Sequence, residues 1–222
     1  MSSRVQVIAL VDLGIGNLRS VERALRRAAE DAGAACEVAR TGDPDAIARA
    51  DKVVVPGQGA FRDCAAALAA GVGEALRAQI RRGTPYLGIC LGLQALFPAS
   101  EEAPGAAGLG VFEGAVVRLP GGAVDPATGA RVKIPHMGWN QVALVREVKG
   151  PLGGLGDSAP HLYFVHSYHA VPADPSLVAA VAEHGPHRIT AAIERENVTA
   201  VQFHPEKSQE AGLRLLRRFV EG

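Results

Sequence analysis

One cysteine lies in a pattern that can make it a nucleophile. Residues 88–92 read Gly-Ile-Cys-Leu-Gly, the spacing of a nucleophile elbow with cysteine in place of serine. An apolar run precedes Cys90 and a helical pattern follows from Leu91 to Phe97, so we expect the thiol in a sharp strand-to-helix turn. The helix N-terminus would set positive potential beside the sulfur, which favours a thiolate. The alternative is a buried packing cysteine.

A thiol nucleophile needs a base, and His204 is the best candidate. It ends an apolar run and is followed by Pro205 and Glu206. Residues two apart in an extended chain project to the same side, so the carboxylate of Glu206 can fix the orientation of the imidazole. Taken alone, this segment could equally be an ordinary turn. Together with Cys90, it favours a nucleophilic site.

A glycine-flanked loop could stabilise negative charge on the reacting group. Gly57, Gln58 and Gly59 follow an apolar run, and glycine permits backbone conformations closed to other residues. Such a loop can aim a backbone N–H at an oxyanion, next to the N–H of Leu91. A plain β-turn is the other interpretation.

The elements that must position these residues follow an alternating order. Apolar runs over residues 5–11, 35–39, 52–55 and 84–89 predict buried parallel strands, and amphipathic segments between them predict helices, the first with Asn17 as its N-cap. This order predicts an α/β fold: a mostly parallel central sheet with helices on both faces.

The second half predicts mixed or antiparallel strands that extend the sheet. Short runs separated by Pro and Gly occupy residues 111–119, 132–134, 141–145, 162–165 and 177–182, and residues 191–194 and 200–203 are expected to pair as the last strands. An amphipathic helix is predicted from Gln209 to Val220. Because no repeat or break in composition interrupts the chain, we expect one domain over residues 1–222.

Composition excludes several classes of protein. Lys and Arg total 23, as do Asp and Glu, so there is no basic excess for nucleic acid or an anionic membrane. The 48% hydrophobic content excludes a mostly disordered chain. No apolar run reaches the ~20 residues of a membrane helix. The first eleven residues lack a secretory pattern, and three widely spaced cysteines indicate a reducing compartment, so we expect a cytoplasmic protein.

Longer segments carry a family resemblance. The elbow with Gln94, and the His204 segment, resemble the class I, triad-type glutamine amidotransferases. Four segments resemble more narrowly the glutaminase subunits of imidazole glycerol phosphate synthase: residues 12–18, 134–140, 163–169 and 204–208. The sequence departs from that pattern at Gln58, where valine is more frequent, and at Leu93, where methionine is common. Neither is a triad position, although the first leaves open how the oxyanion loop is held.

The resemblance implies a reaction and a substrate. Glutamine would be hydrolysed to glutamate and ammonia by Cys90, His204 and Glu206. Oxyanion and glutamine contacts would come from Gly57, Gln58, Gly59, Leu91, Gln94, Ser167 and Tyr168. No cofactor is implied. No metal site is expected, because the histidines lack cysteine or carboxylate neighbours at ligand spacing.

The resemblance also implies a partner. Ammonia would pass to a separate (β/α)₈-barrel cyclase subunit in a heterodimer, which would make imidazole glycerol phosphate and an aminoimidazole carboxamide ribotide in histidine biosynthesis. Residues carried over as partner contacts are Asn17, Met137, Trp139, Asn140 and Lys207. This chain has no eight-fold βα pattern of its own, so the cyclase must be another chain.

Three other functions remain open from the sequence. The acceptor could belong to anthranilate, guanylate or pyridoxal phosphate synthesis, although residues 134–140 and 163–169 argue against that. The chain could be a free-standing cysteine hydrolase such as a peptidase, or a non-catalytic binding module. The intact Cys90, His204 and Glu206 argue against the last.

Overall fold

An eight-stranded mixed sheet forms the centre of the molecule. The structure is a computed structural model that describes residues 4–126, 129–156 and 158–222. The strand order is β2-β1-β3-β4-β12-β11-β10-β7. The first five strands are parallel to one another: β2 (Cys36–Thr41), β1 (Gln6–Val11), β3 (Lys52–Gly57), β4 (Tyr86–Cys90) and β12 (Val198–Val201). The prediction of a mostly parallel α/β sheet is confirmed.

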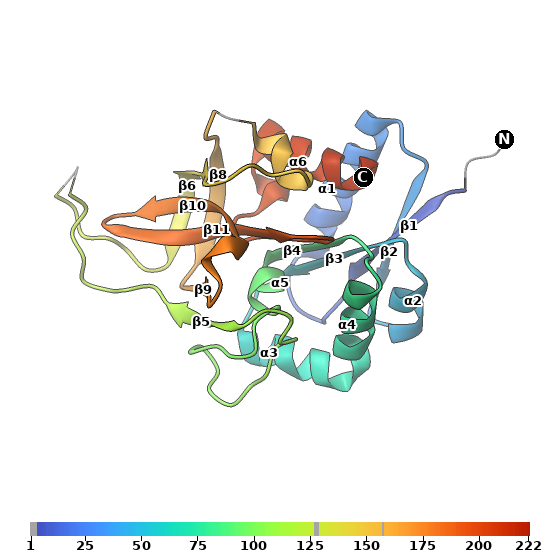
Figure 1. Ribbon diagram of the computed structural model, residues 1–222, viewed down its shortest axis with the longest axis horizontal. Coiled ribbons are helices and arrows are strands. Elements are labelled where there is room, and N and C mark those ends of the chain that lie inside the picture. Colours follow the sequence, from blue (N-terminus) through green and yellow to red (C-terminus); the bar gives the residue numbers. More distant parts are fainter. Residues whose placement is uncertain (1–3, 127–128, 157) are drawn as a thin grey trace.

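Helices cover both faces of the parallel strands (Figure 1). One face carries α1 (Leu18–Ala32), α6 (Gln209–Glu221) and the 3₁₀ segment Pro151–Leu155. The other carries α2 (Pro44–Arg49), α3 (Phe61–Ala67), the π-helical turn Leu68–Val72 and α4 (Gly73–Arg81). Each layer packs its apolar stripe on the sheet, as Leu18, Val21 and Leu25 of α1 do. The carboxyl ends of the strands are left free for loops.

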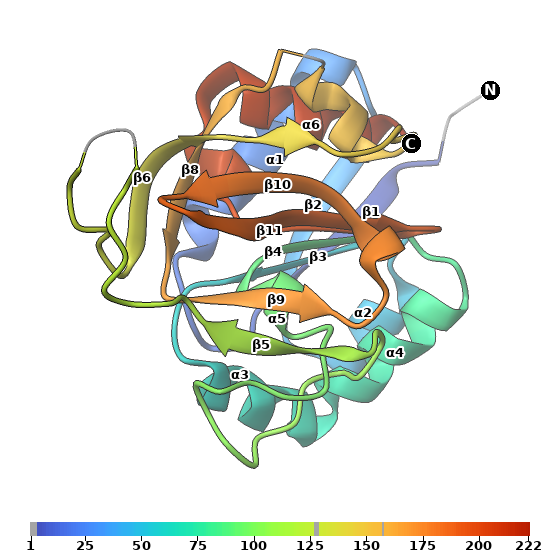
Figure 2. The same ribbon diagram turned by 60° about the vertical axis from the view of Figure 1, so that its left-hand side comes forward.

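The antiparallel half adds three sheet strands and two separate ribbons. In the sheet, β12 pairs with β11 (His187–Arg195), then come β10 (Val178–His184) and β7 (Ala143–Leu144). One ribbon joins β5 (Gly114–Arg118) to β9 (Tyr168–Pro172), and the other joins β6 (His136–Gln141) to β8 (His161–His166). Figure 2 brings both ribbons forward, beside the β10–β11 hairpin. Short 3₁₀ turns complete the fold at Pro175–Leu177 and Pro205–Lys207.

Some local predictions differ from the structure. The antiparallel pairing of residues 191–194 with 200–203 is confirmed, with Ala192 opposite Val201. The strand predicted at 132–134 is wrong: those residues form no named strand, and the nearby strand is β6, which begins at His136. The runs at 111–119 and 162–165 form β5 and β8 of the ribbons instead of extending the sheet, whereas 141–145 and 177–182 contain the sheet strands β7 and β10 as predicted. The helix after Cys90 is shorter than predicted, since α5 spans only Leu91–Gln94.

The start of α1 also corrects an expectation. Asn17 occupies the N-cap position, but its side chain accepts no capping hydrogen bond; its Nδ2 donates to the Ser20 hydroxyl at 3.2 Å.

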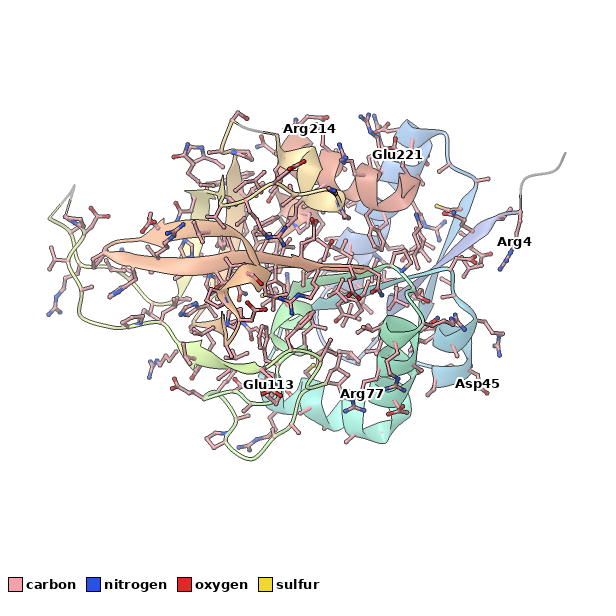
Figure 3. The ribbon with its side chains drawn as sticks, viewed as in Figure 1. Arg4, Asp45, Arg77, Glu113, Arg214 and Glu221 are labelled. Carbon is pink, nitrogen blue, oxygen red and sulfur yellow. The ribbon has the colours of Figure 1, made fainter. Side chains whose placement is uncertain are left out.

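Charged side chains such as Arg77 and Glu221 project from the periphery (Figure 3). None of the helices in the described ranges has the length and apolar character needed to cross a bilayer.

Candidate active site

Cys90 lies at the junction of β4 and α5 in a strained turn. Its φ of 54° and ψ of −103° are unusual for a residue with a side chain, and such strain persists only where the surroundings impose it. A Cβ on Gly88 would come 2.6 Å from the Gly92 carbonyl oxygen, and one on Gly92 would come 1.8 Å from the Val55 carbonyl oxygen. Glycine is therefore required on both sides, and the predicted elbow is present.

His204 and Glu206 form a buried pair beside the sulfur. The carboxylate Oε1 of Glu206 lies 2.8 Å from Nδ1 of His204, and the two side chains are 2% and 1% exposed. A carboxylate only accepts, so Nδ1 carries the proton and Nε2 is free to face Cys90. The 3₁₀ turn Pro205–Lys207 brings the carboxylate back onto the imidazole.

The charge state of His204 follows from its neighbours. Burial lowers its pKa, but interaction with the Cys90 sulfur and the hydrogen bond to Glu206 raise the pKa of His204 to about 9. Nε2 makes no hydrogen bond of good geometry within the described residues, although the sulfur is close enough to exert this effect. Its protonated form is therefore favoured at neutral pH.

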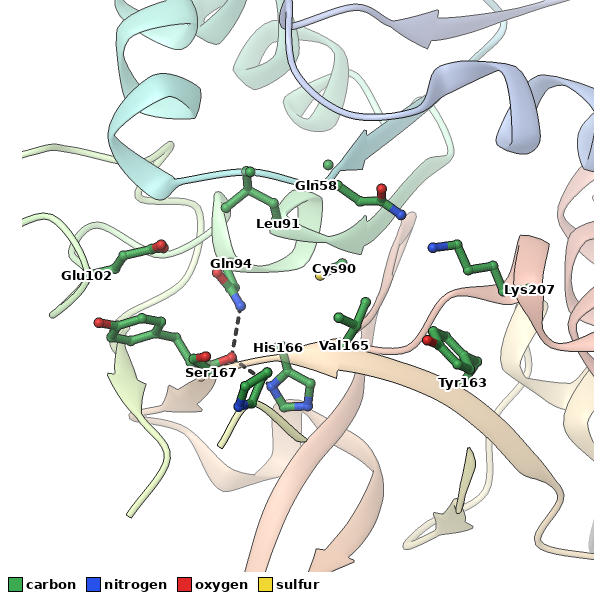
Figure 4. Close-up of a pocket in the computed structure, with 14 residues that line it drawn as sticks. Gln58, Cys90, Leu91, Gln94, Glu102, Tyr163, Val165, His166, Ser167 and Lys207 are labelled. Atoms are coloured by element: carbon green, nitrogen blue, oxygen red, sulfur yellow. Dashed lines mark hydrogen bonds between the residues drawn. The ribbon is translucent and has the colours of Figure 1, made fainter. Parts of the chain in front are cut away.

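A cavity of about 400 Å³ opens over Cys90. Figure 4 shows Gln58, Leu91 and Gln94 on one side of the sulfur, and Val165, His166 and Ser167 on the other. Gly57, Gly59, Glu102, Pro135, Tyr163, Tyr168 and Lys207 complete the lining. All seven residues predicted to form the oxyanion and glutamine contacts line this one cavity.

The glycine-flanked loop lies directly against the elbow. Gly57 is in register with Cys90 across β3 and β4, and a Cβ on Gly57 would lie 2.5 Å from the Cβ of Leu91. Gly59 has a φ of +145°, which side chains rarely adopt. A Cβ on Gly16 would come 2.9 Å from the backbone nitrogen of Gln58, so the loop after β1 packs on this peptide. The loop therefore depends on close backbone contacts from two sides.

The comparisons with known proteins fit this geometry. The family model described as glutamine amidotransferase class-I matches residues 11–221. The chain belongs to this family. Imidazole glycerol phosphate synthase subunit HisH of Syntrophotalea carbinolica is 48% identical over 214 residues, which are 96% of this chain and 98% of the relative. The same subunit of Methylococcus capsulatus is 49% identical, over 96% and 95% of the two chains.

Solved structures support the amidotransferase fold. A crystal structure described as a glutamine amidotransferase matches with a TM-score of 0.69 over 96% of this chain and 97% of that one. Its identity is 21%, so the likeness speaks for the fold alone. The resemblance inferred from the sequence is confirmed.

Gln94 and Tyr168 of the amidotransferase are linked at the floor of the cavity. Nε2 of the buried Gln94 donates to the Tyr168 carbonyl at 2.9 Å and to Oε1 of Gln202 at 3.2 Å. Nε2 of Gln202 in turn lies 3.5 Å from the Cys90 sulfur. Sequence analysis missed Gln202. The only local signal was a glutamine in an otherwise apolar strand, two residues before His204.

His166 of the cavity lining pairs with His136, which is not part of the lining. Nδ1 of His166 lies 2.9 Å from the Tyr168 carbonyl oxygen, which only accepts, so Nδ1 carries a proton and Nε2 of His166 is left as an acceptor. Nδ1 of His136 lies 2.9 Å from that Nε2 and donates to it. Nε2 of His136 then accepts from the Asn140 amide at 3.1 Å. Each ring is thereby fixed in one neutral tautomer.

The residues expected at a partner interface are not all exposed. Met137 and Trp139 of β6 are 62% and 47% exposed, and the Lys207 ammonium lies 5.6 Å from the ring centroid of the neighbouring Tyr163. Asn17 is also exposed, near the oxyanion loop. Asn140 points the other way, since its Nδ2 donates to the Glu183 carbonyl at 2.7 Å.

Among the described residues, no three His, Cys, Asp or Glu side chains are grouped as metal ligands.

Proposed function

We propose that this chain hydrolyses glutamine and passes the ammonia to a separate cyclase subunit of imidazole glycerol phosphate synthase. The two relatives above carry the name of that enzyme's HisH subunit and match nearly the whole chain. The cyclase, a (β/α)₈ barrel, would make imidazole glycerol phosphate and an aminoimidazole carboxamide ribotide in histidine biosynthesis. Residues 1–222 act as a single amidotransferase domain.

The first half of the reaction makes a thioester. An imidazolium at His204 beside the sulfur holds Cys90 as a thiolate, which attacks the side-chain amide carbon of glutamine. The carbonyl oxygen becomes an oxyanion. His204 then gives its Nε2 proton to the departing nitrogen, so ammonia leaves and a γ-glutamyl thioester remains on Cys90.

The second half releases glutamate. The neutral imidazole of His204 takes a proton from water, and the hydroxide formed attacks the thioester carbon. That proton transfer restores the imidazolium. Collapse of the tetrahedral intermediate then expels the Cys90 thiolate, and the new carboxyl group loses its proton to water as glutamate leaves. The Glu206 carboxylate stabilises that imidazolium through Nδ1 and holds its orientation, without taking the proton itself.

Backbone groups stabilise the two oxyanions. Leu91 begins α5, where N–H groups have no partner within the helix, and its side chain lines the cavity. A second N–H comes from the loop Gly57 to Gly59, on the adjacent strand end. Gln94, Ser167 and Tyr168 hold the glutamine at the other end of the cavity.

The partner would bind on the face that carries Tyr163 and Lys207, two residues of the cavity lining. Met137 and Trp139 present exposed apolar surface there, Lys207 adds a charge, and Asn17 borders the oxyanion loop. We place the heterodimer in the cytoplasm, where the three free cysteines Cys36, Cys64 and Cys90 stay reduced.

The observation that carries this proposal is the buried His204–Glu206 pair at the Cys90 elbow, under a cavity of about 400 Å³. The test is to mix the chain with its cyclase and acceptor and measure glutamate and imidazole glycerol phosphate. One-to-one association and equal formation of both products are expected. Full glutamate release without any partner would favour a stand-alone hydrolase. The absence of glutamate release under every condition would favour a binding module.

A further inference from the structure

Gln202 is a fully buried polar residue that no step above uses. It follows β12 directly, and its backbone N–H donates to the Ala191 carbonyl at 2.8 Å, which holds the chain in place. An amide side chain in an apolar interior is costly unless its polar atoms are paired. Its two ends contact Cys90 and Gln94, both of which line the cavity.

The orientation of the Gln202 amide is dictated by a backbone carbonyl. The Tyr168 oxygen can only accept, so the group of Gln94 that lies 2.9 Å away must be its NH₂. The same NH₂ lies 3.2 Å from Gln202, which must therefore present its oxygen to Gln94. If the Gln202 amide were rotated by 180°, its NH₂ group would face the NH₂ group of Gln94, and neither could accept a hydrogen bond.

The remaining end of Gln202 is then an N–H donor aimed at the nucleophile. Nε2 lies 3.5 Å from the Cys90 sulfur, within range of a hydrogen bond to sulfur. A second donor, Nδ1 of His166, also binds the Tyr168 oxygen and helps keep that acceptor in place. Gln94 thus donates to both Tyr168 and Gln202, and Gln202 in turn donates to Cys90.

We propose that Gln202 is a further catalytic residue, whose amide N–H stabilises Cys90 as a thiolate. A donor binds a charged acceptor more strongly than a neutral one, so this contact favours the thiolate over the thiol. In the resting enzyme it raises the population of nucleophile. During thioester hydrolysis it stabilises the same sulfur as a leaving group, and that second role rests on the proposed function.

Other ionisable groups lie beside the sulfur or line the same cavity and must be held constant in a test. His204 and Glu206 lie beside the sulfur. The ionisable groups across the cavity are Glu102, Tyr163, His166, Tyr168 and Lys207. A substitution at Gln202 replaces none of these residues, and Gln202→Met adds no charge that could act on them.

The experiment measures alkylation of Cys90 by iodoacetamide against pH, with the modified peptide identified by mass spectrometry. The variants are Gln202→Met, which removes the donor at similar volume, and Gln202→Glu, which places a carboxylate there. Gln6→Glu, at the opposite end of the parallel strands, is the matched control. We expect the midpoint of alkylation to rise by about one pH unit in Gln202→Met, since one charged hydrogen bond is worth about tenfold in ionisation. In Gln202→Glu it should rise by at least as much, because a carboxylate also repels the thiolate. The control should match the wild type.

The complex with cyclase and acceptor provides the second readout. We expect the kcat for glutamate release to fall about tenfold in Gln202→Met with a small change in the KM for glutamine. Unchanged alkylation midpoints in both folded variants would overturn the proposal. If the KM for glutamine also rose, Gln202 would position Gln94 without acting on the Cys90 sulfur. Shifted midpoints in a chain whose wild type releases no glutamate would sink the proposed function and leave the Gln202–Cys90 contact standing.

Discussion

The two ring nitrogens of His204 have different roles in the proposed mechanism. Nδ1 is committed to Glu206 at 2.8 Å, and this leaves Nε2 to exchange protons at the reacting centre. Removing the imidazole removes the proton carrier, whereas neutralising the carboxylate removes only the charge that stabilises and orients it. The two changes should therefore have unequal costs.

We expect Glu206→Gln to lower the kcat of the complex by less than His204→Ala does, the difference being roughly tenfold or more. The amide oxygen of Gln can still accept from Nδ1, so the ring keeps its tautomer while losing its counter-ion. Steady-state glutamate release with both variants makes the comparison. Equal losses would mean that Glu206 does more than orient the imidazole.

Residue chemistry was predictable where it is local in the sequence. Cys90 could be found because the elbow is five consecutive residues, and His204 with Glu206 because they are two residues apart. The expected extended chain is wrong, however, since a 3₁₀ turn brings the carboxylate onto the imidazole. Gln202 could not be found, because its contact with Cys90 depends on β12 lying beside β4, which the sequence does not state. A local motif predicts the nucleophile, but the order of strands in the sheet decides which other side chains contact it.

At the scale of elements, the loop after β3 depends on Gly59 more than on any side chain. Ile15 lies 3.6 Å from where a Cβ of Gly59 would be, so there is room for one, but the φ of +145° disfavours it. A peptide flanked by Gly57 and Gly59 can present either its N–H or its carbonyl to the cavity, and a bound partner can select the first.

We expect the isolated chain to be a poor glutaminase that the acceptor-loaded cyclase activates. Gly59→Val should restrict rotation of the peptide and change the activation ratio more than it changes the affinity for the cyclase. Loss of one oxyanion donor lowers the rate by about 10²–10³-fold, so we expect an activation ratio of that order. Glutamate release with and without the liganded cyclase measures it. Full activity of the isolated wild-type chain would remove this switch but leave the triad intact.

The β6–β8 ribbon should make the protein sensitive to acid. Burial lowers the pKa of His136 to about 4, with the nearby His184 adding to the effect. Burial and the neighbouring His136 lower the pKa of His166 to about 3. Both folded pKa values lie below the ordinary 6.5, so the stability from these neutral rings is complete above pH 6.5. It is lost as pH falls through 4 and towards 3.

Denaturant unfolding at a series of pH values tests this. The free energy of unfolding of the wild type should fall between pH 6.5 and 4, and that of His166→Gln should fall less over the same range. Carboxylates outside the ribbon contribute equally to both proteins and cancel in the difference. Parallel curves would show that the ribbon histidines do not link acid to stability.

Periodicity predicted the parallel strands well and the ribbons poorly. Val53 to Val55 form a continuous apolar run because both faces of β3 are covered. In β6 exposure alternates: His136 is buried, Gly138 and Asn140 are half-buried, and the residues between them are exposed. Because the one buried side chain is polar, hydrophobic patterning favours the neighbouring apolar run at residues 132–134. Polar groups buried in a network have no signature of their own in hydrophobic patterning.

At the scale of the whole molecule, one face joins β6, β8 and the turn at Lys207. The Trp139 ring lies 6.0 Å from that of Tyr163, edge to face, and 47% of Trp139 is exposed. Exposed aromatic residues of this kind are frequent anchors in interfaces. The prediction that Trp139 lies outside the core of this chain agrees with its exposure.

Trp139 is the only tryptophan in the chain, so its fluorescence reports on that face. We expect red-shifted emission from the isolated chain and a blue shift when a cyclase, chosen or engineered without tryptophan, is added. Trp139→Ala should weaken association by about tenfold or more, because the loss of an interface aromatic anchor costs over 1 kcal/mol. An unchanged spectrum at saturating cyclase would place the interface elsewhere.

The central claim is that this chain produces the ammonia that the cyclase uses. It is tested most directly with Cys90→Ser and two nitrogen sources. The complex carrying this variant is given the acceptor with either glutamine or an ammonium salt, and imidazole glycerol phosphate is measured. In the proposed mechanism Cys90 produces ammonia and takes no part at the cyclase site. Synthesis from glutamine should therefore fall on the order of 10⁴-fold or more, while synthesis from ammonia stays at the wild-type rate. If both syntheses fell together, Cys90 would be a structural residue and the assignment of the active site would be contradicted.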